Sequence, residues 1–272
     1  MGAPSSRSLP AMTVGELEAV VDGLAPFALA QEWDNVGLLL GRRDRTIAKV
    51  LVALELREAV LDEAADAGCE AVVVHHPPIF PSLTTVTDTP GPQRLILRAA
   101  ETGVAIVAAH TNLDSAAGGL NDLMAADLGV ATEAPLAPNA QMANVGLGRV
   151  GTRQAAPLGA LVAHVMAVYG EAGVTHSGDL ETVVSRVACC TGSGAGLIDL
   201  ARDANVDVYV TCDLKYHDAD RAGELPLIGL GHATVERRAM RQWTKTLAAT
   251  LEKQGVGAVF AETDTDPWSP SR

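Results

Sequence analysis

Two adjacent histidines, His75 and His76, directly follow a run of four apolar residues, three of them valine. The apolar run predicts a buried strand, and Pro77, which has no amide hydrogen, ends its pairing. Ligands bind at the carboxyl ends of strands in open α/β sheets. Two imidazoles at this position could therefore hold two neighbouring metal ions, one each. Alternatively, one histidine caps a loop and the other lies on the surface.

Two further segments offer side chains of the types that bind metals. A second apolar strand, residues 104–110, ends on His110 and is followed by Asp114. His232 and Glu236 are spaced four residues apart at the start of a predicted helix, so they share one helix face. Asp114 could instead cap a helix, and the His–Glu pair could be an ordinary surface pair. The combined set has mixed nitrogen and oxygen donors and suits Zn, Fe, Mn, Co or Ni: His75, His76, Asp114, His232 and Glu236.

Composition and charge exclude several classes of protein. A formal charge of −13 argues against non-specific nucleic-acid binding, which requires lysine and arginine to displace counterions. The four cysteines form no C-x-x-C pair, which favours buried, reduced thiols over a thiolate metal site. Residues 1–10 lack the apolar core of a signal peptide, and no apolar run is long enough to span a bilayer. We therefore expect a cytoplasmic protein without a membrane-spanning segment.

The elements around these residues repeat one pattern. Residues 49–76 and residues 186–217 both have the order strand, helix, valine-rich strand and polar functional groups. This order builds parallel sheets, and its recurrence suggests an internal duplication, although two ordinary strand–helix–strand units could also resemble each other by chance. We predict lobes at 13–136 and 140–236, joined by a linker within 133–144. Residues 237–262 could pack back on the first lobe, and residues 1–12 and 263–272 are predicted to be flexible tails.

Two other motifs have plain structural explanations. The glycine-rich residues 192–196 could direct amides at a phosphate, but they lack the lysine and hydroxyl residue of a P-loop. A tight turn is the favoured interpretation. In residues 32–38 (EWDNVGL), Asp34 and Asn35 could simply bond their own backbone in a turn.

Five motifs, taken together and in this order, resemble the family labelled GTP cyclohydrolase 1 type 2, also called domain of unknown function 34. They are residues 32–38 (EWDNVGL), 74–77 (VHHP), 110–114 (HTNLD), 211–217 (TCDLKYH) and 231–236 (GHATVE). The resemblance covers nearly the whole chain, from about residue 14 to residue 259. Larger family members have an inserted domain for which this chain has no room.

The resemblance implies an α/β fold of two similar three-layer α/β/α lobes with a dinuclear metal site between them, and a ring-shaped homohexamer. It also implies two divalent metal ions per chain, bound by the five residues His75, His76, Asp114, His232 and Glu236. The candidate catalytic residues would line the cavity beside the metals: His217, Asp213, Lys215 and His110. Two positions depart from the family pattern. Glu55-Leu-Arg57 replaces an expected Asp-x-Thr, and Cys212 replaces a glycine, where its bulk could narrow the pocket.

The function implied is a metal-dependent hydrolase that acts on a nucleotide or related heterocycle, as in opening of the GTP purine ring. A bound metal would supply hydroxide, a histidine would transfer protons, and Lys215 would bind an anionic part of the substrate. The alternative is a non-enzymatic metal carrier or oligomeric scaffold that binds protein partners. The polar groups beyond the metal ligands favour catalysis, since a carrier does not need them.

Overall fold

The computed structural model describes residues 12–268, and their contacts group them into two compact units. Unit 1 contains residues 12–24, 35–109 and 244–263, and unit 2 contains residues 25–34, 110–243 and 264–268. The long helix α9 (His232–Glu252) is shared, because its residues from 244 onward belong to unit 1. Residues 1–11 of the predicted N-terminal tail and residues 269–272 of the predicted C-terminal tail lie outside the described residues.

Unit 1 is built on a five-stranded sheet in the order β15-β4-β5-β6-β2, which is parallel except for β2. Its strands are β2 (Gly37–Leu40), β4 (Lys49–Glu55), β5 (Ala71–His76), β6 (Ala105–Ala108) and β15 (Gly257–Phe260). In the central strand β5, Val72, Val73 and Val74 have no exposed surface. Both faces of the sheet are covered, so an unbroken apolar run fits here better than an alternating one.

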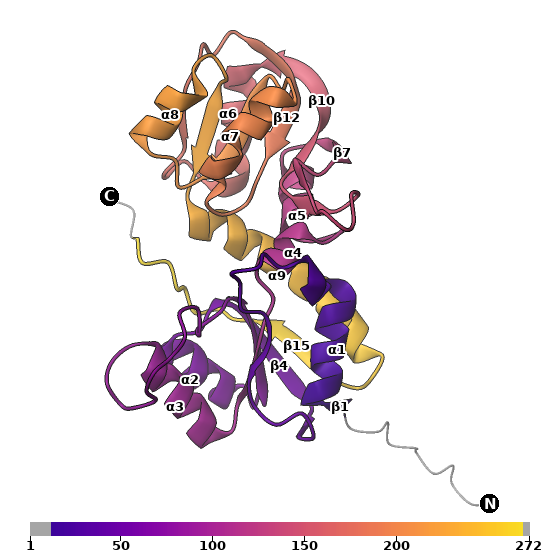
Figure 1. The fold of residues 1–272 in the computed structure, drawn as a ribbon, viewed down its shortest axis with the longest axis vertical. Helices are drawn as coiled ribbons and strands as arrows, with labels where there is room; N and C mark the ends of the chain where they lie inside the picture. Colours follow the sequence, from indigo (N-terminus) through magenta and orange to yellow (C-terminus); the bar gives the residue numbers. More distant parts are fainter. Residues whose placement is uncertain (1–11, 269–272) are drawn as a thin grey trace, which may run out of the picture. The chain divides into compact units, whose positions relative to one another are not determined.

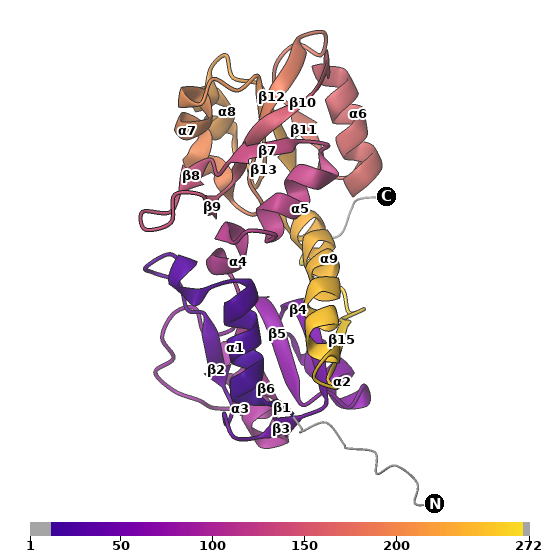
Figure 2. The same cartoon turned by 90° about the vertical axis from the view of Figure 1, so that its right-hand side faces the viewer.

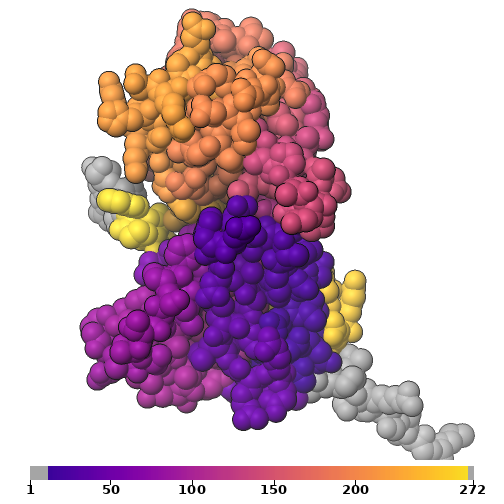
Figure 3. All heavy atoms as spheres, viewed as in Figure 1, coloured from indigo at the N-terminus to yellow at the C-terminus, as the bar shows by residue number. Residues whose placement is uncertain are grey.

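Helices cover both faces of this sheet. They are α1 (Val14–Leu24), α2 (Glu58–Asp66) and α3 (Pro92–Thr102), with a short pair of strands, β1 (Met12–Thr13) and β3 (Thr46–Ile47), beside them. Figure 1 shows α2 and α3 on one side of the sheet and α1 on the other. The N-terminal segment, coloured indigo, forms much of the face of unit 1 seen in Figure 3. These layers place the carboxyl ends of β4, β5 and β6 at one edge.

Local sequence signals explain where several of these elements begin and end. The predicted capping box opens α1: Thr13 Oγ1 accepts a hydrogen bond from the Glu16 amide, and Glu16 accepts one from the Thr13 amide. Helix α3 ends at Gly103 with a φ of +73°, a conformation that glycine adopts without strain. Near the C-terminus, Glu63 accepts hydrogen bonds from the amide and hydroxyl of Thr263. Residue 263 is therefore anchored, unlike the flexible tail predicted to begin there.

Unit 2 is built on a six-stranded sheet in the order β11-β14-β13-β12-β10-β7. Its strands are β7 (Ala131–Ala134), β10 (Arg149–Pro157), β11 (Thr175–His176), β12 (Val183–Cys189), β13 (Val208–Cys212) and β14 (Leu227–Leu230). The neighbours β12, β13 and β14 run parallel, as β4, β5 and β6 do in unit 1. The two units therefore share the three-strand parallel core that the repeated sequence pattern predicts.

Helices also cover both faces of the sheet in unit 2. They are α4 (Thr111–Ser115), α5 (Leu120–Asp127), α6 (Leu158–Tyr169), α7 (Ile198–Asp203) and α8 (Tyr216–Ala222), with short 3-10 helices η1 (Phe27–Leu29) and η2 (Gly194–Leu197). Helices α5 and α6 pack in one apolar cluster, and α7 and α8 pack in another. Figure 2 shows α6 on one side of the sheet and α7 and α8 on the other. The fold is thus α/β, with three layers in each unit.

The region between the predicted lobes differs from the sequence-based expectation. The predicted linker, 133–144, includes the end of β7 and all of β8 (Ala137–Pro138), which pairs with β9 (Gly146–Leu147). Contacts also group residues 110–136 with unit 2, whereas we predicted a first lobe of 13–136 and a second of 140–236. The physical reason is packing: Met124 of α5 and Leu128, the C-cap residue of that helix, lie in the same buried cluster as Leu158 and Val187. Apolar side chains on α5 make it part of the core of unit 2.

Candidate metal centre

The adjacent histidines of unit 1 end the central strand β5. Their ring centroids are 5.1 Å apart with a tilt of 41°, and a ring nitrogen of each lies within 4.8 Å of the other. His75 is fully buried, and its Nδ1 is 2.8 Å from the carbonyl oxygen of Ala109. A carbonyl only accepts, so Nδ1 is the ring nitrogen that donates this bond. Both residues belong to the strand, and the bond of His75 to Ala109, just beyond β6, agrees with the loop-cap interpretation of one histidine, whereas His76 is half-buried rather than on the surface.

The second histidine has a different partner. His76 Nδ1 lies 3.2 Å from Oε1 of Glu55, which is the residue opposite it on β4. Glu55 also forms an ion pair with Arg57. Burial opposes ionisation of Glu55, but the hydrogen bond from His76 and the positive charge of Arg57 outweigh it, and the pKa of Glu55 lies below its ordinary value. The departure from the family pattern at Glu55 therefore keeps a carboxylate on His76.

In unit 2, His110 and Asp34 form a buried pair that the sequence analysis missed. His110 Nδ1 donates to Asp34 Oδ1 at 2.8 Å, and Asp34 Oδ2 accepts from the amide and hydroxyl of Thr111. The Asp34 side chain has no exposed surface. Burial opposes its ionisation, but these bonds and the charge of His110 outweigh that effect and lower the pKa of Asp34 to about 2.

The local-turn interpretation of residues 32–38 is consequently wrong. Asp34 bonds residues more than 70 positions away, and the Asn35 side chain donates to the carbonyl of Ile79 at 2.6 Å. Trp33, which is 60% exposed, presents an edge-on ring 6.2 Å from that of His110. An acidic residue beside a tryptophan in a polar cluster was the available signal, but its partner could be identified only in three dimensions.

Asp114 lies in the first turn of the short helix α4 and is 8% exposed. Its Oδ1 accepts a hydrogen bond from the hydroxyl of Thr191, which follows strand β12. Asn121 links the same two segments, since it donates to the carbonyl of Asp114 and accepts from the Thr191 amide. The N-cap position of α4 is His110, so the helix-cap interpretation of Asp114 is wrong.

His232 and Glu236 lie on the first turns of α9, where the i, i+4 spacing brings His232 Nε2 within 2.8 Å of Glu236 Oε2. Glu236 is 2% exposed, and one of its carboxylate oxygens lies within 4.8 Å of one of Asp114. Burial of the His232 ring opposes protonation, but Glu236 and Asp213 outweigh it and raise the pKa of His232 to about 9. His232 is thus half-buried and Glu236 is buried, which contradicts the interpretation of the two residues as an ordinary surface pair.

Asp213 holds the other nitrogen of His232. Its Oδ2 lies 2.6 Å from Nδ1, and its backbone has a φ of +55°, which is uncommon for a residue other than glycine. The preceding Cys212 has no exposed surface and packs in the apolar core of unit 2, where burial raises the pKa of its thiol. The expectation that Cys212 narrows the pocket is therefore not met, because its side chain lies in the core.

The glycine-rich residues 192–196 form a tight turn against the sheet, as the favoured interpretation predicted. The carbonyl of Gly192 accepts from the Cys212 amide, and that of Gly194 accepts from the Tyr209 hydroxyl. A Cβ added to Gly192 would lie 2.7 Å from Glu236 Oε1. Glycine at this position lets the turn approach the buried carboxylate closely.

Lys215 and His217 stand apart from this network. Lys215 is the N-cap residue of α8 and lines a groove of about 210 Å³ with His176 and Tyr216. His217 is exposed and contacts the ring of Tyr216 edge-on at 5.3 Å. Within residues 12–268, neither side chain bonds a predicted metal ligand. Of the four predicted catalytic residues, Asp213 is therefore bonded to His232, a predicted metal ligand, and His110 is bonded to the buried carboxylate of Asp34. Among the described residues, Lys215 and His217 make no comparable bond.

The chemistry of these side chains fits a divalent metal. His75, His76 and His232 each have Nδ1 held by an oxygen acceptor, which fixes the ring and makes Nε2 the atom that would bind a metal. At His232 a metal would replace the proton that Nε2 shares with Glu236. Two buried carboxylates as close as those of Asp114 and Glu236 repel each other when both are ionised, and a cation would relieve this repulsion. The described residues thus include groups of His, Asp and Glu that could hold a metal ion. All four cysteines are buried free thiols and none belongs to these groups.

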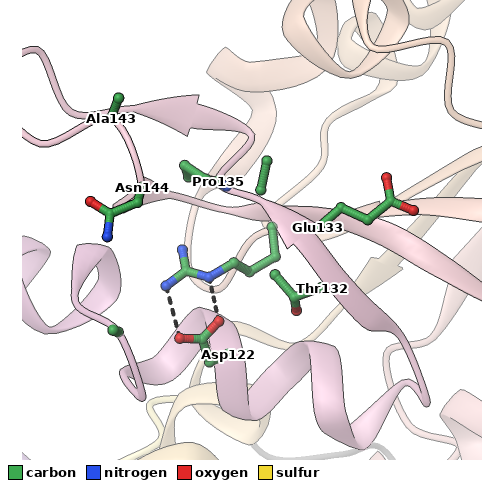
Figure 4. A pocket seen from close by; sticks show the side chains of 9 residues that line it. Asp122, Thr132, Glu133, Pro135, Ala143 and Asn144 are labelled. Carbon is green, nitrogen blue, oxygen red and sulfur yellow. Dashed lines mark hydrogen bonds and ion pairs between the residues drawn. The ribbon is translucent and has the colours of Figure 1, made fainter.

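A separate cavity of about 370 Å³ in unit 2 has a structural role (Figure 4). Its one arginine, Arg149, is 3% exposed, forms an ion pair with Asp122 and donates to the carbonyls of Ala116, Gly146 and Gly148. Figure 4 shows Asp122 with both bonds to this guanidinium. These five bonds occupy the guanidinium, so this cavity offers no cationic group to a ligand.

Comparison with known proteins places these features in a family. The family model described as Duf34/NIF3 (NGG1p interacting factor 3) matches residues 12–267. The chain belongs to the DUF34/NIF3 family. A GTP cyclohydrolase 1 type 2 homolog of Clostridium perfringens is 30% identical over 261 residues, which cover 94% of this chain and 99% of that protein. A GTP cyclohydrolase 1 type 2 homolog from Lactococcus lactis is 33% identical over 226 residues, which cover 81% of this chain and 86% of the Lactococcus protein.

Solved structures of DUF34/NIF3 proteins share the fold. The crystal structure of a Bacillus cereus protein related to NIF3 superposes with a TM-score of 0.88 at 25% identity, covering 95% of this chain and 99% of that one. The family resemblance inferred from the five motifs is thus confirmed over nearly the whole chain. Within residues 12–268, no helix combines the length and apolar character needed to cross a bilayer.

Proposed function

We propose that this DUF34/NIF3 protein is a hydrolase that uses two divalent metal ions to act on a nucleotide or a related heterocycle. The proposed ligands are His75, His76, Asp114, His232 and Glu236. One observation carries the proposal. Each of the three proposed ligand histidines has its Nδ1 held by a carbonyl or carboxylate oxygen, so each ring is oriented with Nε2 as the atom that would bind a metal.

The donor set also bears on the kind of metal. Three imidazole nitrogens and two carboxylates suit Zn, Fe, Mn, Co or Ni better than calcium or magnesium, which prefer oxygen ligands alone. Asp114 and Glu236 would supply the carboxylate oxygens of such a centre. When bound, such ions act as Lewis acids and lower the pKa of coordinated water.

We propose that His110 moves protons in the reaction. Its Nδ1 is held 2.8 Å from the buried carboxylate of Asp34, so Nε2 is the atom that would take a proton from the nucleophile or give one to the leaving group. This arrangement resembles the acid–histidine pair of hydrolytic triads, in which the acid orients the ring and stabilises its charged form. Asp213 would orient His232 rather than react.

Lys215 and His217 remain candidates for substrate binding and proton transfer. Lys215 lines a groove beside the exposed ring of Tyr216, a combination that suits a ligand with an aromatic ring and an anionic group. This role is compatible with the name of the curated relatives, GTP cyclohydrolase 1 type 2 homolog, although the name of a relative describes that protein.

A metal-binding scaffold is the second candidate. The family description, NGG1p interacting factor 3, names an interaction with a protein rather than a reaction. The same ligands would serve a scaffold or a metal carrier. The Asp34–His110 pair favours the hydrolase. A scaffold has no need for a histidine whose ring is oriented by a buried carboxylate, and the Asp34 carboxylate is itself held by further hydrogen bonds from Thr111.

The deciding experiment combines metal content with turnover. Metal-repleted protein is expected to hold two ions per chain by elemental analysis and to hydrolyse at least one member of a nucleotide panel that includes GTP. His75→Ala should abolish turnover, whereas His164→Gln should retain it, because His164 Nε2 contacts a backbone carbonyl away from the proposed ligands. Turnover that survives His75→Ala would refute the hydrolase, and fewer than one metal per chain would refute both candidates. Bound metal without turnover across the panel would favour the scaffold.

We also propose that the protein works as a homohexamer in the cytoplasm. The hexamer follows from the family resemblance, and four buried free thiols fit a reducing compartment. Light scattering coupled to size-exclusion chromatography tests the assembly, and a mass near that of one chain, 28.1 kDa, would contradict it.

A further inference from the structure

The two adjacent histidines of unit 1 differ in what holds them. His75 Nδ1 donates to the neutral carbonyl of Ala109 at 2.8 Å, whereas His76 Nδ1 lies 3.2 Å from the charged carboxylate of Glu55. The parallel register of β4 and β5 creates this difference, since it pairs Glu55 with His76 directly. Although the two residues are neighbours of the same type, their electronic surroundings are unequal.

The partner on Nδ1 controls how strongly Nε2 binds a metal. A carboxylate draws the Nδ1 proton toward itself and makes the ring more basic, and loss of such a partner typically costs about 10- to 100-fold in metal affinity. A neutral carbonyl fixes the ring orientation with a weaker effect on its basicity. On this basis His76 would bind a metal more strongly through Nε2 than His75 would.

Arg57 moderates the carboxylate. Its guanidinium forms an ion pair with Glu55, and the exposed fractions are 51% for the Arg57 side chain and 24% for that of Glu55. A cation on the far side of Glu55 withdraws negative charge from the bond to His76. Arg57 thus touches the carboxylate that holds a proposed ligand.

We propose that Glu55 is a positioning residue that makes the metal position served by His76 the tighter of the two, with Arg57 limiting its effect. This inference rests on the proposed two-metal centre. It predicts that the full-length protein loads its ions in two distinguishable steps, and that the charge of Glu55 sets the separation between them.

The test measures metal affinity rather than turnover. Metal-free protein is titrated with Co²⁺ or Zn²⁺ against a chromophoric chelator, which yields one dissociation constant for each step. Glu55→Gln keeps an oxygen acceptor for His76 and removes only the charge. It should weaken the tighter step by about 10- to 100-fold and leave the other within about twofold. Arg57→Gln should change the same step in the opposite direction.

Two controls separate this effect from a structural one. Glu58→Gln removes the same charge three residues away, where the carboxylate pairs with Arg94 and Arg98, and should leave both constants unchanged. In a double-mutant cycle, Glu55→Gln should have no further effect in a His76→Ala background and its full effect in a His75→Ala background.

Each outcome decides the matter. Wild-type protein that binds no metal overturns both the metal centre and this inference. Wild-type protein that binds two ions while Glu55→Gln weakens both steps equally, or neither, overturns this inference alone. A Glu55→Gln variant that loses thermal stability with unchanged affinities would assign Glu55 a structural role and likewise overturn it.

Discussion

Replacing Asp34 by asparagine should remove a specific part of the acid sensitivity of this protein. Asp34 has an ordinary pKa of 3.8 and a pKa of about 2 in the folded state, where its carboxylate is fully buried and accepts bonds from His110 and Thr111. A carboxylate with a lowered pKa stabilises the folded state above its unfolded pKa, and this contribution is lost as the pH falls through the folded pKa. The full contribution at neutral pH corresponds to about 2.4 kcal/mol.

The magnitude can be followed across an accessible range of pH. Between pH 6 and pH 3, the unfolded state takes up most of a proton at Asp34 while the folded state takes up little, so about 1.1 kcal/mol is lost. Asp34→Asn has no charge to titrate. The difference in unfolding free energy between wild type and Asp34→Asn should therefore shrink by about 1 kcal/mol over this interval.

Chemical denaturation of metal-free protein at several pH values measures this difference directly. Asp203→Asn provides a matched control, since it removes the same charge from an exposed position at the end of α7. A wild-type minus Asp34→Asn difference that stays constant from pH 6 to pH 3 would refute the reasoning. It would mean that the bonds from His110 and Thr111 do not favour the charged carboxylate.

Three further predictions concern single residues. In metal-free protein, His232 contributes stability that is complete below pH 6.5 and is lost as the pH rises through about 9, so the advantage of wild type over His232→Gln in denaturation should fall across this range. Gly192→Ala places a Cβ 2.7 Å from the carboxylate of the proposed ligand Glu236, at a φ of +64°, and should lower the free energy of unfolding by about 1–3 kcal/mol and weaken metal binding. Gly196→Ala meets nothing within 4 Å and should change neither quantity in melting and metal-titration experiments. Arg149→Met removes the cation paired with Asp122 at the cavity and should lower the free energy of unfolding by about 3–5 kcal/mol in chemical denaturation. A decrease of less than about 1 kcal/mol would show that water replaces the lost bonds.

The sequence by itself was sufficient for the fold class, the family and the segments that carry chemistry. Valine-rich apolar runs predict buried strands from composition alone. A proline or glycine after such a run marks the end of the strand, because these residues act through local backbone geometry. His76, His110, Asp213 and His232 were thus recognised as strand-end or helix-start residues before their surroundings were known. His76 ends β5 and His110 follows β6, the second and third of the parallel strands β4, β5 and β6. Asp213 and His232 follow β13 and β14, the second and third of the parallel strands β12, β13 and β14.

Only the tertiary structure decided what holds these side chains. Asp34 is 76 residues from His110, Glu55 is 21 residues from His76, and Asp213 is 19 residues from His232. Packing also assigned α5 to unit 2 and directed Cys212 into the core. Hydrogen bonds between distant segments depend on strand register and packing, which no local propensity encodes. The side chains at positions 75 and 76 are therefore visible in the sequence, whereas the difference between the hydrogen-bond partners of His75 and His76 is a property of the folded sheet.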